Sequence, residues 1–111
     1  MKDVEFIKHA EDTFERCLTL LKKKGEEYSQ DKLTDDRLAS FRLGGAIQNI
    51  SPKEALLGMM AKHLASIVDM SKRNTQAEQI ALWREKTGDT INYLVLLQAL
   101  VEEEAQRSTI E

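Results

Sequence analysis

The sequence predicts an all-α fold: a four-helix bundle-like domain with two long helices, one medium helix and one short helix. Apolar residues recur at helical spacing over most of the 111 residues, and only five Gly and one Pro interrupt them. With 41% hydrophobic and 32% charged residues, the chain has enough apolar material for one core. We therefore expect a single domain over residues 1–111, with its core over 3–104 and a frayed C-terminal tail over 105–111.

The first helix is expected over residues 3–24. Its apolar stripe, with spacings of three and four, consists of Ile7, Ala10, Phe14, Cys17 and Leu21. Lys22, Lys23 and Lys24 complement the negative end of a helix, and Gly25 is expected to end it. Cys17 lies on the stripe, which favours a small buried side chain over a nucleophile.

A shorter second helix is expected over residues 35–48, carrying Leu38, Phe41 and Ile47. Gly44 and Gly45 fall inside it. Because glycine weakens a helix interior, we expect a break or a kink at this pair.

The third helix has the clearest start in the sequence. Ser51 can cap it, Pro52 suits its first position, and Glu54 can reach back to the N–H of the cap. We expect this helix to run to about Met70 on the stripe Leu56, Met60, His63, Ile67 and Met70. A second face carries Glu54, Gly58, Ala61 and Ala65, and its small residues would let a neighbouring helix approach closely.

The fourth helix is expected to start at a capping box of Thr75 with Glu78 and to end near Glu104. Between Ile91 and Val101 it is apolar nearly all round, so this half should be buried on most sides. It outruns the third helix, and one short bundle cannot cover the excess apolar surface. We therefore expect a homodimer or a tetramer.

Composition and charge exclude several classes of protein. A net charge of −3 with both signs interspersed gives no footprint for nucleic-acid binding. The longest apolar run is too short to cross a bilayer, and the N-terminus lacks the apolar run of a signal peptide. One cysteine cannot form an internal disulfide. We expect a cytoplasmic protein without a nucleic-acid or membrane partner.

Asp89 stands where an apolar residue belongs. Leu82, Asp89 and Leu96 are seven residues apart and share nearly one azimuth on the fourth helix. A buried carboxylate costs several kcal/mol unless a cation or good donors meet it. Glu85, one turn earlier, can point the same way, and two such carboxylates suit Mg²⁺ or Mn²⁺. The alternative is that Glu85 is solvated and Asp89 pairs with a lysine.

The third helix carries polar residues at helical spacing. His63 occupies the apolar stripe, where a histidine is more often a satisfied core or interface residue than a ligand. Beside it, Lys62, Ser66 and Asp69 form a polar seam. This seam is either a solvated face or the partner of the Glu85 and Asp89 edge, with Lys62 neutralising Asp89 or a phosphate.

Aromatic residues give two further candidates. Tyr28, after Gly25, Glu26 and Glu27, is either a stacking residue for a base or a packing anchor. Trp83, the only tryptophan, is equally compatible with a core, an interface or a stacking role.

The order of these features resembles the MazG-like all-α nucleotide pyrophosphohydrolases, in a small phage or prophage type. The matching segments are K-K-K-G-E-E-Y, then I-S-P-K-E-A-L-L-G-M-M-A-K-H-L-A-S-I-V-D-M, then W-R-E-K-T-G-D-T-I-N-Y-L-V-L-L. The last is similar to the closing metal motif of the family, in which an acidic residue precedes a G-D that opens an apolar helix end. The resemblance covers residues 5–102.

The resemblance implies a bundle that binds a nucleoside triphosphate with Mg²⁺ (or Mn²⁺). Water would attack the α–β phosphate linkage and yield a nucleoside monophosphate and pyrophosphate. Asp89 would bind the metal, Glu85 would bind it or orient water, and Asp69 would supply a further carboxylate. The implied catalytic residues are Glu85, Asp89 and Lys62, and the implied substrate-binding residues are Lys62, His63, Tyr28, Asn92 and Tyr93.

One feature of the family is missing. Its better-known members carry an E-E-x-x-E cluster on the helix that here offers Lys62, His63, Ser66 and Asp69. Two functions therefore remain open: an Mg²⁺-dependent nucleotide pyrophosphohydrolase or nucleotide-binding relative, and a catalytically silent phage-type helical protein that acts through protein–protein interaction. A phage-encoded protein would work in the host cytoplasm.

Overall fold

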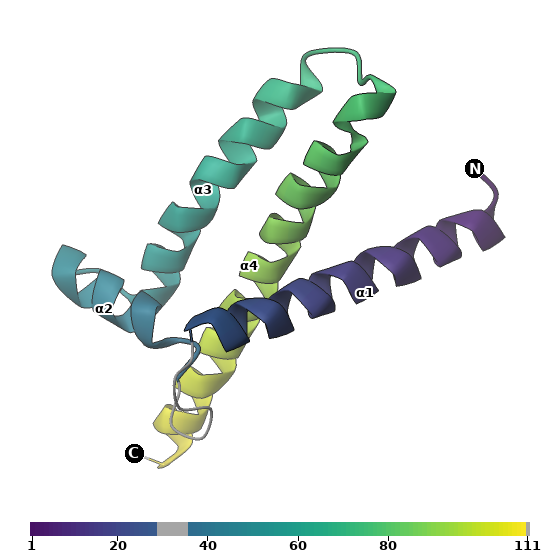
Figure 1. Ribbon diagram of the computed structural model, residues 1–111. Coiled ribbons are helices and arrows are strands. Elements are labelled where there is room, and N and C mark those ends of the chain that lie inside the picture. Colours follow the sequence, from purple (N-terminus) through teal and green to yellow (C-terminus); the bar gives the residue numbers. More distant parts are fainter. Residues whose placement is uncertain (29–35, 111) are drawn as a thin grey trace. The chain divides into compact units, whose positions relative to one another are not determined.

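The computed structural model describes residues 1–28 and 36–110 of the chain (Figure 1). It contains four α-helices and one short 3₁₀-helix, and no β-strand occurs in these residues. The predicted all-α fold class is therefore confirmed. The chain divides into two compact units, Met1–Asp35 and Asp36–Glu111, and each is described by itself.

The first unit contains one long helix, α1, Asp3–Tyr28. Asp3 and Glu5 lie in its first turn, where acidic side chains complement the positive helix end. The prediction that Gly25 ends this helix is wrong, because α1 continues for three more residues, and the three lysines are not at its end. An isolated glycine costs only about 1 kcal/mol in a helix, which helix-favouring neighbours such as Glu26 and Glu27 offset. The thiol of Cys17 is buried, as predicted.

The second unit starts with α2, Ala39–Gln48, which begins four residues later than predicted. The predicted break at Gly44 and Gly45 is wrong, since both lie inside the helix. A Cβ at position 45 would lie 2.7 Å from the carbonyl oxygen of Ile50, so this glycine lets the chain fold back tightly. The helix ends instead at Asn49, whose φ of 57° is left-handed.

Helix α3, Pro52–Ser71, starts as predicted. The Ser51 hydroxyl accepts a hydrogen bond from the Glu54 N–H at 3.1 Å, and the Ser51 N–H donates to Oε1 of Glu54 at 3.3 Å. This capping box satisfies two backbone N–H donors that the first helical turn would leave open.

A 3₁₀-helix, η1, Ala77–Gln79, leads directly into α4, Ile80–Ile110. The predicted capping box of Thr75 with Glu78 is wrong by one residue, because Gln76 and Gln79 form it. Helix α4 also runs past the predicted end at Glu104 and includes most of the tail.

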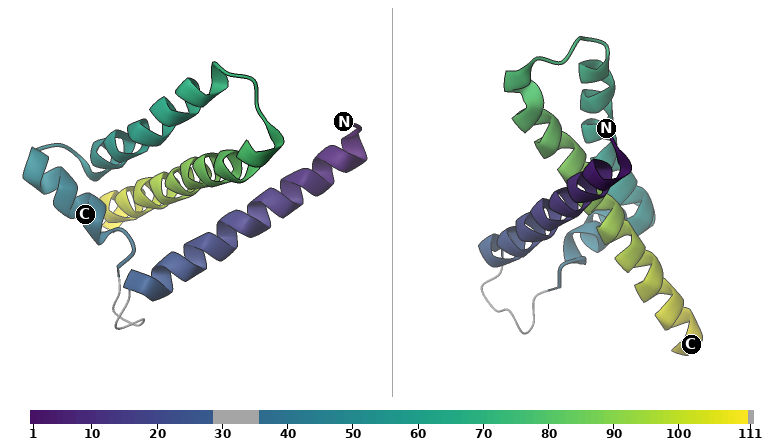
Figure 2. Two further views of the ribbon diagram at one scale, coloured as in Figure 1. Left: turned by 45° about the horizontal axis from the view of Figure 1, so that its top comes forward. Right: turned by 90° about the vertical axis from the view of Figure 1, so that its right-hand side faces the viewer.

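Helices α3 and α4 form an antiparallel hairpin, and α2 packs against α3 near the end opposite the connection (Figures 1 and 2). The core of this unit consists of Leu38, Phe41, Leu56 and Leu100, with Met59, Tyr93, Leu96, Leu97 and Ala99 packed against it. Leu56 is fully buried. The core thus occupies the end of the hairpin that carries α2.

An ion-pair network joins α2 to α4 beside this core. The Arg42 guanidinium donates to Glu103 at 2.6 and 2.8 Å and to Asp36 at 2.6 Å. These hydrogen bonds raise the pKa of Arg42. The hydrogen bond from Arg42, followed by that from the Leu38 N–H, lowers the pKa of Asp36. The network fixes the start of α2 against the C-terminal half of α4.

The apolar half of α4 is less covered than predicted. Leu94 and Val95 are each 49% exposed and Val101 is 46% exposed within the single chain. One side of the segment packs on the core through Tyr93, Leu97 and Leu100, so the opposite side remains on the surface.

Candidate functional site

Asp89 lies where α4 passes α3, at the edge of the core. Its side chain is only 14% exposed. Leu96, seven residues after Asp89 on the same side of α4, packs against the core. Leu82, seven residues before Asp89, is 43% exposed. The carboxylate therefore stands at the border between the packed end of the hairpin and its open end.

His63 approaches this carboxylate from α3. Its Nδ1 lies 3.8 Å from Oδ2 of Asp89, and the His63 side chain is 25% exposed. At this distance no hydrogen bond forms, and the pair is an ion pair only when the imidazole carries a second proton. The structure thus places His63 beside Asp89, at the position that the sequence assigned, as one alternative, to Lys62.

The imidazole of His63 is held by an aromatic neighbour on α4. The ring centroids of His63 and Tyr93 lie 5.2 Å apart with an interplanar angle of 50°. Nδ1 of His63 is buried and makes no hydrogen bond within the described residues. A buried polar atom without a hydrogen-bond partner costs about 1–3 kcal/mol. A ligand that formed a hydrogen bond with Nδ1 would therefore be bound favourably here.

The other members of the polar seam differ in burial, and Ser66 is half-buried. Lys62 is exposed on α3. The carboxylate of Asp69 accepts a hydrogen bond from Arg73 at 2.6 Å, one turn along the same helix, and both side chains are 65% exposed. The structure therefore does not bring Asp69 to the pair formed by His63 and Asp89.

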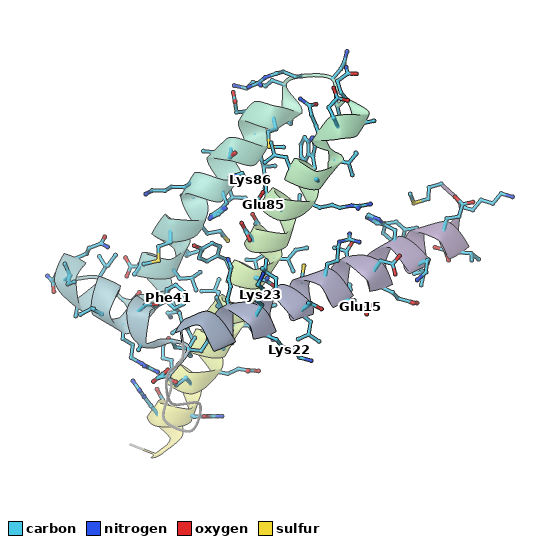
Figure 3. The ribbon with its side chains drawn as sticks, viewed as in Figure 1. Glu15, Lys22, Lys23, Phe41, Glu85 and Lys86 are labelled. Carbon is cyan, nitrogen blue, oxygen red and sulfur yellow. The ribbon has the colours of Figure 1, made fainter. Side chains whose placement is uncertain are left out.

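Glu85 lies on α4 one turn before Asp89 and is exposed, next to the half-buried Lys86 (labelled in Figure 3). Within residues 1–28 and 36–110, no three His, Cys, Asp or Glu side chains gather into a group that could hold a metal ion. Two carboxylates on consecutive turns nevertheless suit Mg²⁺, which proteins commonly hold by one or two carboxylates while substrate phosphates and water complete its shell. The donors fit a metal that arrives with a phosphate ligand better than one held by the protein alone.

The other candidate residues for substrate binding or stacking are Tyr93, Asn92, Tyr28 and Trp83. Tyr93 is half-buried against His63, and Asn92 is 6% exposed, the buried polar side chain of this part of α4. Tyr28 ends α1, but its side chain, like those of Glu26 and Glu27, lies outside the described residues. Trp83 is half-buried near the start of α4.

The pairing of His63 with Asp89 was missed from the sequence, although a signal for it exists. Both residues lie thirteen positions from Gln76, near the middle of the connection. Residues equally far from the turn of an antiparallel hairpin lie opposite each other, and the core residues Leu56 and Leu96 obey the same rule, twenty positions away. Placing the turn correctly would have predicted the pair.

A surface hollow lies along α1 in the first unit. Its lining residues are Asp12, Glu15, Arg16, Thr19, Leu20 and Lys23, of which Glu15 and Lys23 are labelled in Figure 3. It includes none of the predicted site residues. Asp12 is already paired with Lys8 at 2.7 Å, which lowers the pKa of that carboxylate. The hollow is therefore an open groove between charged side chains of one helix.

No model of a known protein family, no curated protein and no solved structure matches the chain. None of the helices in the described part has both the length and the apolar character needed to cross a membrane.

Proposed function

We propose that this protein is an Mg²⁺-dependent nucleoside triphosphate pyrophosphohydrolase, or a nucleotide-binding relative of one, as its resemblance to the MazG-like family implies. One observation carries the proposal. The Asp89 carboxylate is held largely out of water, 3.8 Å from a buried imidazole nitrogen that lacks a hydrogen bond. Such a carboxylate is stabilised by a cation bound beside it.

Each residue has a role in the proposed reaction. Asp89 and Glu85 would hold the metal together with the substrate phosphates. Lys62 would bind a phosphate oxygen, and Tyr93, His63 and Asn92 would form the floor of the site. Bound Mg²⁺ would neutralise the phosphates and favour the attacking hydroxide form of water. The water oxygen would form a bond to the α-phosphorus while the bond from that phosphorus to the bridging oxygen breaks. Pyrophosphate would leave with the bonding electron pair, and the proton of the water would pass to solvent. In this proposal Asp69 takes no part, because its carboxylate is paired with Arg73.

A second function is favoured by a different observation. Four large apolar side chains are exposed by 42–56% on α3 and α4: Leu64, Val68, Leu94 and Val95. Exposed apolar side chains that form a contiguous patch mark sites of protein–protein contact. A catalytically silent phage-type helical protein that binds a protein partner would use such surfaces. It needs neither a metal nor an intact site at Asp89.

We further propose a homodimer or tetramer as the functional form, working in the cytoplasm, or in the host cytoplasm for a phage-encoded chain. The exposed apolar side of α4 at Leu94, Val95 and Val101 supports association, since burying it against a second copy removes it from water.

The proposal is tested by incubating the purified protein with a panel of ribo- and deoxyribonucleoside triphosphates and Mg²⁺ or Mn²⁺, and measuring pyrophosphate release. The matched controls are Asp89→Asn, which keeps the shape of the side chain, and Asp69→Asn, which removes a carboxylate outside the site. Release by the wild type and the Asp69 variant, but not by the Asp89 variant, supports the enzyme. Absence of turnover, together with no metal-dependent thermal shift for any nucleotide, would contradict the enzyme and favour the second function, a helical protein that binds a protein partner.

A further inference from the structure

We propose that the outer face of α3 is the surface that binds a second copy of this chain, with the two α3 helices packed antiparallel about a two-fold axis. The outer α3 face consists of Leu57, Gly58, Ala61, Leu64, Ala65 and Val68. This inference rests on the proposed homodimer and adds to it a surface other than the exposed side of α4. It does not depend on the enzyme activity.

Side chains on the outer α3 face have no partner helix within the second unit. Leu57 is 43% exposed, Leu64 is 42% exposed and Val68 is 56% exposed. The opposite face of α3 carries the buried residues Leu56 and Met60. Helix α3 is therefore apolar on two sides, and only one of them is used inside this unit.

Within the second unit, no other helix packs closely against Gly58. A Cβ built at this position meets no atom within 4 Å. Its backbone is ordinary helix without a positive φ. Glycine in a helix interior is less favourable than alanine, and the close approach of another backbone is one physical reason to have glycine at such a position.

The large and small residues of this face are arranged so that the face complements itself. In an antiparallel pair with Ala61 opposite Ala65 of the second copy, Gly58 lies opposite Val68, and Leu57 and Leu64 flank the contact. A two-fold interface requires such self-complementarity, because each residue meets its counterpart twice. Small residues at the crossing let the helix axes come to the short end of their usual 8–10 Å separation.

Charge complementarity selects the antiparallel arrangement. The same register places Glu54, at the start of α3, opposite Lys72 of the second copy, at its end, and the two-fold axis repeats the pair. Both side chains are exposed, and Lys72 has no ion-pair partner in the described residues. A parallel arrangement would instead bring Glu54 to Glu54 and Lys72 to Lys72. The contact spans about 27 Å of helix, so we expect a dimer that dissociates on dilution.

The first experiment compares Ala65→Arg with a matched control, Ala81→Arg, which changes an exposed alanine on α4 in the same way. Sedimentation equilibrium over a range of concentrations gives the dimer dissociation constant, and circular dichroism shows that both variants fold. We expect the wild type and the Ala81 variant to have the same dimer dissociation constant. We expect the dissociation constant of the Ala65 variant to be higher by about tenfold or more. A monomeric wild type, or an Ala65 variant that dimerises like the control, overturns the proposal.

A second experiment identifies the occupant of the face. The double variant Ala61→Cys with Ala65→Cys is oxidised, and the cross-linked peptides are sequenced. We expect covalent dimers that join position 61 of one copy to position 65 of the other. A monomer in which native Cys17 of α1 is joined to an introduced cysteine would show that α1 covers the face, and that result overturns the proposal. Pyrophosphate release measured on the same dimer reports on the enzyme separately, because neither Ala61 nor Ala65 is among the residues assigned to the Asp89 site.

Discussion

His63 of α3 and Asp89 of α4 lie opposite each other across the helical hairpin, with Nδ1 3.8 Å from Oδ2. The histidine is steadied by the ring of Tyr93, and the carboxylate is 14% exposed. A wholly apolar pair at these positions would pack the hairpin without any desolvated charge. The polar pair therefore calls for a role other than packing, and the proposed function supplies one.

Replacing the carboxylate should separate function from stability. Asp89→Asn keeps the side-chain shape and removes a charge that is largely withdrawn from water, so we expect the free energy of unfolding in metal-free buffer to stay the same or rise. Urea denaturation measures it. The matched control, Asp69→Asn, removes an exposed pair with Arg73 and should change the free energy by less than about 0.5 kcal/mol. A loss of more than about 2 kcal/mol in the Asp89 variant would mean that the carboxylate is a structural anchor instead.

Arg42 should matter more for stability than the other charged side chains on the surface of the second unit. It donates to both oxygens of Glu103 and to Asp36, and its side chain is only 26% exposed. We expect Arg42→Met to lower the free energy of unfolding by about 1–2 kcal/mol, since two carboxylates lose their shared partner. Lys53→Met, which breaks a single exposed pair with Glu104, is the control and should lower it by less than 1 kcal/mol. Equal effects would show that the network adds nothing beyond its separate pairs.

Stability should depend on pH through Asp36. The hydrogen bond from Arg42, followed by that from the Leu38 N–H, lowers the pKa of this carboxylate below its ordinary value of 3.8. The folded state therefore binds the proton less readily than the unfolded state, and the stabilisation is present above pH 3.8 and is lost as the pH falls through the folded pKa. The difference in unfolding free energy between wild type and Asp36→Asn should shrink toward zero on acidification. A difference that stays constant below pH 3.8 would contradict this account.

Two glycines should respond oppositely to the same substitution. At Gly45 a Cβ would lie 2.7 Å from the carbonyl oxygen of Ile50, so Gly45→Ala must shift the chain reversal and should destabilise the protein by about 1–3 kcal/mol. At Gly58 nothing lies within 4 Å, and Gly58→Ala should stabilise the dilute protein by about 0.4–1 kcal/mol. Thermal and urea denaturation of both variants measure this. A destabilising Gly58→Ala in dilute protein would reveal a contact that the second unit itself does not contain.

Local signals predicted parts of this fold well. The start of α3 followed from Ser51, Pro52 and Glu54, because a capping box satisfies donors within one turn and needs no other part of the chain. The ends of α1 and α2 did not follow from Gly25, Gly44 and Gly45. A glycine weakens a helix by a small amount that neighbouring residues can offset, so its position alone does not decide where a helix ends.

The candidate site depended on the geometry of the hairpin more than on motifs. The unusual placement of Asp89 was visible in the sequence, since it interrupts a run of leucines on one azimuth. The approach of His63 to Asp89 was not predicted, because the register of α3 against α4 depends on where the connection turns. The predicted capping box at Thr75 and Glu78 was displaced by one residue from the observed one. The pairing of Asp69 with Arg73 could have been predicted from their i to i+4 spacing, and this pair competes with any role of Asp69 toward α4.

The most direct test of the account is calorimetric titration of the wild-type protein with a non-hydrolysable nucleoside triphosphate, with and without Mg²⁺, repeated on Asp89→Asn. The account predicts binding that requires the metal in the wild type and is lost in the variant, while both proteins give the same helical circular dichroism. Binding that persists in the Asp89 variant, or wild-type binding that is the same without Mg²⁺, would contradict the claim that this carboxylate holds the metal of the site.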